Sequence, residues 1–114
     1  MALAIKYRLT GKDSEYVFRK GETVKSSFFF IKFSENKVGY CRLAILVPVR
    51  VSKSSVIRNR LRRMIAEIFK AAGLERQPLD VIFVAAPSIV GRPFEEIKSE
   101  LTSAIGAIFV NPHT

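Results

Sequence analysis

The segment from residue 54 to residue 72 constrains the fold most, because its apolar side chains recur at the spacing of an α-helix. Ser54 suits the N-terminal cap of this helix, and Gly73 suits its C-terminal end. A helix with one apolar stripe buries that stripe against another element, so the rest of the chain must supply a partner surface. The stripe consists of Ile57, Leu61, Met64, Ile65 and Ile68.

Two more helices and three strands are predicted around this segment. Gly21 ends the first helix in a left-handed conformation, and Pro93 lies in the first turn of the last helix. Residues 34–37 resemble a hairpin connection, which would make the strands before and after it antiparallel neighbours. The predicted helices cover residues 13–20 and 93–109, and the predicted strands cover residues 23–34, 38–49 and 80–86.

The order of these elements is α-β-β-α-β-α, which predicts an α+β fold. The last strand is apolar throughout, as a strand in the middle of a sheet is when both of its faces are buried. We therefore expect a two-layer sandwich, with helices packed on one small mixed sheet. A chain of 114 residues without repeats or linkers makes a single domain over residues 1–114.

Positive charge is concentrated in the middle of the chain. The formal net charge is +9, from 19 basic and 10 acidic side chains. Residues 36–66 hold eight of the basic side chains and no acidic one. Because like charges on a folded domain repel one another, such a block indicates a polyanionic partner, and a nucleic acid is favoured. The alternative is a surface charged only for solubility, but such a surface would mix both signs.

A basic cluster fans around the exposed half of the predicted helix, and it consists of Arg58, Asn59, Arg60, Arg62 and Arg63. The planar fork of arginine holds a phosphate through two parallel hydrogen bonds and also stacks on bases. The amide of Asn59 suits a 2′-hydroxyl or a base edge. The alternative is an ordinary solvated face with an Arg63–Glu67 ion pair, although such faces normally mix charges.

A phenylalanine-rich strand supplies a second candidate surface. Phe28, Phe30 and Lys32 alternate onto one face of the predicted strand. Two rings beside an ammonium suit stacking on single-stranded bases next to a phosphate contact. The alternative is that Phe28 and Phe30 pack under the first helix. Tyr16 and Phe18 of that helix would line the same groove, although Phe18 also suits a core position.

The sequence lacks the residue sets that catalysis or metal binding requires. The one histidine, His113, lies near the C-terminus, and the acidic residues are scattered, so no nucleophilic triad or metal-dependent nuclease site can be assembled. We expect no catalytic residue, no metal or cofactor bound by the chain, and no small-molecule substrate. A single cysteine, Cys41, indicates a reducing compartment, and no segment suits a signal peptide or a membrane span. We therefore expect a complete cytoplasmic protein without a membrane partner.

Several stretches of the chain resemble the protein subunit of bacterial ribonuclease P. The most specific one runs from Arg58 to Phe69 (RNRLRRMIAEIF) and resembles the signature helix of that family. Weaker similarities cover residues 8–9, 17–21, 42–47 and 80–84. The chain departs from the family pattern at Ser14, Ala44, Val49 and Ala66.

The resemblance implies a ribonucleoprotein that removes the 5′ leader from precursor tRNA. In this family the RNA subunit is the catalyst and uses Mg²⁺, so the chain would be an enzyme only as part of the holoenzyme. The protein would bind ribonuclease P RNA through the basic cluster, together with Arg50 and Lys53. It would hold the leader in a groove between sheet and helix, lined by Tyr16, Phe18, Phe28, Phe30 and Lys32.

The resemblance also implies a left-handed strand–helix–strand crossover around the signature helix, although such connections are nearly always right-handed. Three alternative functions stay open. The first is a structural RNA-binding protein without a cleavage role, such as a ribosomal protein or an RNA chaperone. The second is an autonomous nuclease, which would cut RNA with a metal ion and no RNA subunit. The third is a protein that binds duplex DNA.

Overall fold

The structure is a computed structural model that describes residues 8–9, 11–73 and 76–110. Its elements form an α+β fold, as predicted, with a strand before the phenylalanine-rich one that the sequence did not separate. In chain order they are α1 (Gly11–Lys20), β1 (Glu22–Lys25), β2 (Phe29–Glu35), β3 (Arg42–Leu46), α2 (Ser55–Ala71), β4 (Leu79–Ala85), the short 3₁₀ helix η3 (Pro87–Ile89) and α3 (Phe94–Val110).

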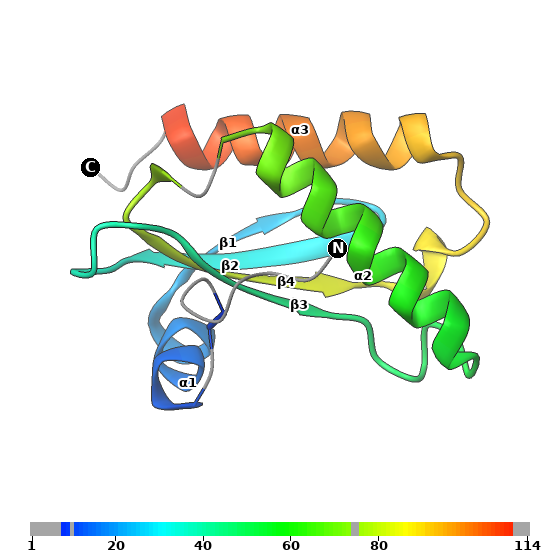
Figure 1. Ribbon diagram of the computed structural model, residues 1–114, viewed down its shortest axis with the longest axis horizontal. Helices are drawn as coiled ribbons and strands as arrows, with labels where there is room; N and C mark the ends of the chain where they lie inside the picture. Colours follow the sequence, from blue (N-terminus) through cyan, green and yellow to red (C-terminus); the bar gives the residue numbers. More distant parts are fainter. Residues whose placement is uncertain (1–7, 10, 74–75, 111–114) are drawn as a thin grey trace.

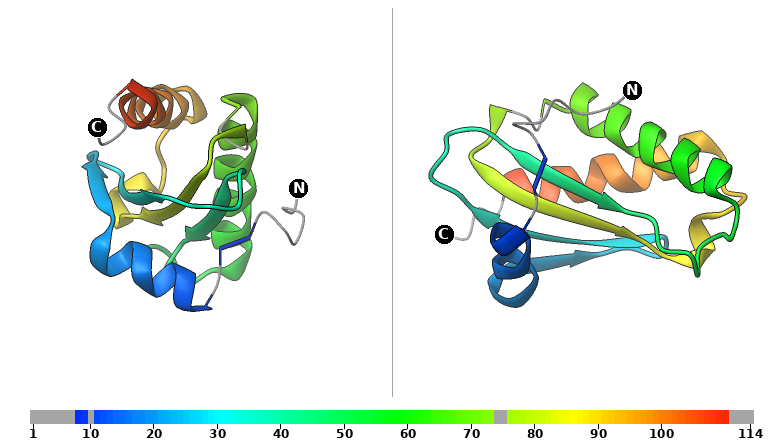
Figure 2. Two further views of the ribbon diagram at one scale, coloured as in Figure 1. Left: turned by 90° about the vertical axis from the view of Figure 1, so that its left-hand side faces the viewer. Right: turned by 60° about the horizontal axis from the view of Figure 1, so that its bottom comes forward.

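Helices cover both faces of the four-stranded sheet, so the predicted two-layer arrangement is wrong in the number of layers. The helices α2 and α3 lie on one face and α1 on the other (Figure 1). The reason lies in β4, where Val81 and Phe83 face α2 and α3 while Ile82 and Val84 face α1. A strand that is apolar on both faces has to be covered on both. Figure 2 shows the same three layers end-on.

The main core lies between the sheet and the pair α2 and α3. Phe29 and Phe83 have ring centroids 5.0 Å apart, and the ring of Phe69 meets that of Phe83 edge to face at 6.2 Å. The predicted stripe of α2 faces this core, since Leu61, Ile65 and Ile68 are buried while Ile57 and Met64 are partly buried against it. Burial of this stripe fixes which face of α2 remains in solvent.

The strand order is β1-β2-β4-β3, and it corrects the predicted hairpin. β2 pairs antiparallel with β4, and β3 pairs parallel with β4, so β4 lies between the two strands that were expected to be neighbours. The segment predicted as one strand over residues 23–34 is a hairpin instead. Lys25 of β1 pairs with Phe30 of β2, and the chain turns at Ser27 and Phe28.

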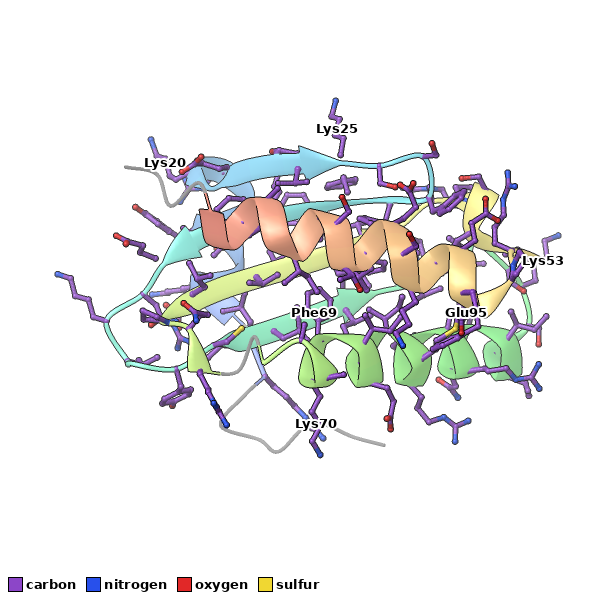
Figure 3. All side chains as sticks on the ribbon, turned by 90° about the horizontal axis from the view of Figure 1, so that it is seen from above. Lys20, Lys25, Lys53, Phe69, Lys70 and Glu95 are labelled. Atoms are coloured by element: carbon purple, nitrogen blue, oxygen red, sulfur yellow. The ribbon has the colours of Figure 1, made fainter. Side chains whose placement is uncertain are left out.

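The connection from β3 through α2 to β4 is a left-handed crossover. In Figure 3, which looks onto the sheet from the side of α2 and α3, β3 and β4 run in the same direction. With both strands pointing upward in that view, the chain rises along β3, returns through α2 in front and enters β4 on the left. The implied topology is thereby confirmed.

Both predicted ends of α2 are confirmed. The side chain of Ser54 accepts a hydrogen bond of 3.3 Å from the backbone N–H of Ile57, and Gly73 beyond the C-terminal end has a φ of 75°. Gly21, in contrast, does not adopt the predicted left-handed conformation. Gly21 follows α1 at a point where the backbone passes close to β2. A Cβ there would lie 2.5 Å from the carbonyl oxygen of Val17 and 2.8 Å from that of Phe33. Close packing therefore requires glycine at this position.

None of the helices formed by residues 11–73 and 76–110 has both the length and the apolar character that a membrane span needs.

Candidate nucleic-acid interface

The basic cluster occupies the face of α2 that points away from the core. Asn59, Arg60 and Arg63 are exposed, and Arg58 and Arg62 are partly exposed. This arrangement follows from the burial of Leu61 and Ile65 on the opposite face of the same turns. The prediction that these five polar side chains surround the exposed half of α2 is confirmed.

Hydrogen bonds orient two arginines of the basic cluster, and no described carboxylate neutralises any of its four arginines. Arg58 donates a hydrogen bond of 2.8 Å from Nη1 to the backbone carbonyl of Ser52, and Arg62 donates from Nη2 to Oδ1 of Asn59. Among the carboxylates that the structure describes, none pairs with any of the four arginines, and the alternative Arg63–Glu67 ion pair does not form. The cluster thus presents uncompensated positive charge with polar donors that are already partly fixed in place.

Arg50 and Lys53 extend this surface along the connection between β3 and α2. Both side chains are exposed, whereas Val51 between them is buried and anchors the connection to the core. Figure 3 shows Lys53 at the N-terminal end of α2 and Lys70 at its other end. The predicted RNA-binding residues therefore lie at one end of the molecule. They belong to the connection from β3 to α2 and to the first turns of α2.

The predicted groove residues lie on the face of the sheet that carries α1. The rings of Phe18 and Phe30 meet edge to face with their centroids 6.5 Å apart, and Phe18 remains 41% exposed. Tyr16 on α1 is 54% exposed. Lys32 lies on the same sheet face as Phe30 and donates a hydrogen bond of 3.0 Å to Oγ1 of Thr23. Phe18, Phe30 and Lys32 are therefore brought together, whereas helical spacing places Tyr16 and Phe18 on opposite flanks of the buried Val17.

Phe28 does not join this group, and its predicted place beside Phe30 is wrong. It lies in the turn before β2, so strand alternation does not apply to it, and its ring is buried in the main core with 4% exposure. The guanidinium of Arg92 covers this ring at 4.9 Å from its centroid. Phe28 therefore packs on the face of the sheet opposite Phe30.

Leu46 lies on the same face of the sheet as Phe30, although sequence reasoning did not single it out. In the sheet register, Phe30 pairs with Val84 and Val84 pairs with Leu46, so the three side chains share one face. Val84 is buried, whereas Leu46 is 42% exposed. Leu46 lies within the strand predicted over residues 38–49, but only the parallel pairing of β3 with β4 brings it into line with Phe30.

Sequence reasoning also missed a buried ion pair on the side of the sheet that carries α1. Arg42 donates from Nε and Nη2 to the two carboxylate oxygens of Asp80, each at 2.8 Å, and from Nη1 to Oδ2 of Asp13 at 3.1 Å. The hydrogen bonds that Asp80 accepts favour the charged guanidinium and raise the pKa of Arg42, against the opposing effect of burial. Together with Asp13, the pair joins β3, β4 and α1, whose residues are far apart in the chain.

No group of three or more His, Cys, Asp or Glu side chains gathers within the described parts of the chain in a way that could hold a metal ion. His113 lies outside the described residues. The described surfaces offer phosphate-binding donors on α2 and aromatic rings on the face of the sheet that carries α1.

Comparison with known proteins connects this geometry to one family. The family model described as Ribonuclease P matches residues 3–108. The ribonuclease P protein component of Thermoanaerobacter sp. (strain X514) is 33% identical over 90 residues, which cover 78% of this chain and 77% of that protein. The corresponding protein of Legionella pneumophila (strain Corby) is 28% identical over 93 residues, with 82% and 80% covered.

Solved structures of the same kind share the fold. The RNase P protein of Staphylococcus aureus superposes with a TM-score of 0.80 at 25% identity, covering 88% of this chain and 93% of that one. The RNase P protein of Thermotoga maritima gives a TM-score of 0.74 at 24% identity, covering 84% and 92%. The chain therefore belongs to the ribonuclease P protein family, whose members are the protein subunit of the endoribonuclease that processes the 5′ ends of tRNA.

Proposed function

We propose that the chain binds ribonuclease P RNA through the basic cluster of α2 and holds the 5′ leader of precursor tRNA against the sheet face that carries α1. The observation that carries this proposal is the absence of carboxylate partners for Arg58, Arg60, Arg62 and Arg63 among the described residues. Four uncompensated arginines on one rigid helix suit a polyphosphate backbone.

RNA binding by α2 would rest on electrostatics and on geometry together. Each arginine that replaces counterions at a phosphate releases them into solution, so affinity should fall steeply with salt concentration. The contacts of Arg58 with Ser52 and of Arg62 with Asn59 restrain two of the forks in advance. Restrained side chains lose less conformational entropy when they bind, which favours affinity.

Leader binding is supported by the surface around Phe30. Phe18 and Phe30 present ring edges and faces to solvent, Leu46 continues the same register row, and Lys32 supplies a positive charge beside them. Base stacking on aromatic rings tolerates any sequence, as recognition of the varied leaders of many tRNAs would require. Lys32 would contact the leader backbone.

The chain would contribute to catalysis by positioning the substrate, without a reacting group of its own. The partner RNA would hold the Mg²⁺ that supplies the chemistry, and the protein would fix the leader relative to that RNA. Positioning of this kind lowers the barrier because the entropy of orientation is lost on binding, before the reaction.

Precursor-tRNA cleavage by bare ribonuclease P RNA at low Mg²⁺, with and without the chain, tests the proposal. We expect strong stimulation by the wild-type protein and reduced stimulation by an Arg58→Ala, Arg62→Ala variant. A structural RNA-binding protein would bind RNA but give no stimulation. Cleavage by the purified chain with metal alone would instead identify an autonomous nuclease.

A further inference from the structure

Arg42 connects the sheet to α1 through two acidic residues of very different exposure. The Asp80 side chain is 7% exposed and that of Arg42 is 19% exposed, so this pair is fixed within the sheet. Asn36 restrains it further by donating from Nδ2 to Oδ1 of Asp80 at 2.8 Å. The third residue, Asp13 of α1, has a side chain that is 58% exposed, and its contact with Arg42 connects the fixed pair to the helix.

Among the described residues, α1 has few other anchors on the sheet. Val17 is the only fully buried side chain of α1, and it packs with Leu9, Ile82 and Val84. The ring contact of Phe18 with Phe30 lies toward the C-terminal end of the helix, whereas the Asp13–Arg42 contact lies in its first turn. A short helix held at only a few points changes its inclination when one of them is lost.

We infer that Arg42 is a positioning residue for substrate binding. Through Asp13 it sets the inclination of α1 over the sheet, and thereby the placement of Phe18 relative to Phe30. Arg42 itself touches neither RNA nor leader in this scheme, because its guanidinium donors face Asp80 and Asp13. The inference rests on the proposed function, since the ring pair matters for activity only if it contacts the leader.

Asp13→Ala and Glu15→Ala make a matched pair of variants for the test. Both remove one exposed carboxylate from α1, but Glu15 makes no ion pair with any described residue, whereas Asp13 pairs with Arg42. Charge alone predicts that both changes strengthen RNA binding slightly, because each removes a negative charge near a polyanion. If Arg42 positions α1 through Asp13, the Asp13→Ala change should instead weaken binding.

The measurement is the Kd of the reconstituted holoenzyme for precursor tRNA with a leader and for mature tRNA without one. Asp13→Ala should weaken binding of the leader-bearing substrate by about threefold, the scale of one partly exposed ion pair, and leave mature tRNA binding unchanged. Asp13→Glu should recover most of the loss. Equal behaviour of Asp13→Ala and Glu15→Ala would overturn the inference.

Two further variants separate positioning from a local effect on the helix end. Asp13 also interacts favourably with the N-terminal dipole of α1, and Arg42→Lys leaves that interaction intact while removing the fork that joins two carboxylates. Arg42→Lys should reproduce the leader-specific loss, and an unaffected Kd would contradict the inference. In the Asp13→Ala, Phe18→Ala double variant the losses should not add, because both act through the same ring; additive losses would also contradict it.

The same assay distinguishes failure of the inference from failure of the proposed function. If the wild-type holoenzyme binds precursor and mature tRNA equally, the proposed leader contact is wrong. If the wild type prefers the precursor and Asp13→Ala and Arg42→Lys keep that preference in full, only the positioning role of Arg42 is wrong.

Discussion

The ring of Phe18 meets the ring of Phe30 edge to face, with the ring planes at 81° to each other. The contact joins α1 to β2 on the face of the sheet opposite α2 and α3. Because Phe18 stays 41% exposed, the pair lies at the rim of the small core under α1 and is not enclosed by it. An aromatic pair at such a rim is open to a stacking partner from solution.

Phe18→Ala and Phe28→Ala should therefore separate leader binding from stability. Phe18→Ala removes one ring contact and should lower the free energy of unfolding by about 1 kcal/mol, while weakening leader binding. Phe28→Ala removes a ring that is 4% exposed and should cost about 3 kcal/mol of stability. Urea unfolding and precursor-tRNA binding measure the two effects. A Phe28→Ala protein of normal stability would contradict the burial of this ring.

Removal of two arginines from α2 should change the salt dependence of assembly with ribonuclease P RNA. Arg58→Ala with Arg62→Ala should raise the Kd by about fivefold or more at moderate salt and reduce the slope of log Kd against log salt by about 1.5. The matched control is Arg76→Ala with Lys98→Ala, which removes the same charge from exposed positions outside the basic cluster. If both double variants change the slope equally, the cluster has no special role.

Two glycine-to-alanine substitutions should change the free energy of unfolding in opposite directions. Gly21→Ala places a Cβ 2.5 Å from a backbone carbonyl oxygen, and because backbone cannot yield as a side chain can, we expect a loss of about 2 kcal/mol or more. Gly106 lies within α3 with no foreign atom within 4 Å of an added Cβ, so Gly106→Ala should stabilise the fold by about 0.5–1 kcal/mol. Thermal or urea unfolding compares the two directly.

Asp80→Ala should be among the most damaging single substitutions in the chain. It would leave the largely buried guanidinium of Arg42 without the carboxylate that accepts two of its hydrogen bonds. Removal of one partner from such a pair costs about 3 kcal/mol or more. Urea unfolding of Asp80→Ala beside Glu95→Ala, which removes an exposed carboxylate, measures the difference. Equal stability of the two variants would show that the pair does not hold the sheet together.

Local patterns predicted the parts of the fold that local forces decide. The limits of α2 follow from Ser54, Gly73 and the apolar spacing between them, all within one segment. The prediction of a hairpin between β2 and β3 failed because strand pairing is a nonlocal choice: β4, far along the chain, inserts between them. The prediction for Phe28 failed because alternation of side chains holds only inside a strand, and the chain turns just before β2.

The sequence by itself determined the chemistry of the basic cluster. Burying the apolar stripe of α2 leaves Arg58, Arg60, Arg62 and Arg63 in solvent, whatever the stripe packs against. Only the tertiary structure decided three long-range features. These are the pairing of Arg42 with Asp80, the alignment of Leu46 with Phe30, and the packing of α1 on the face of the sheet opposite α2 and α3. The physical reason is that helix faces follow from short-range periodicity, whereas these contacts join segments that meet only when the sheet forms.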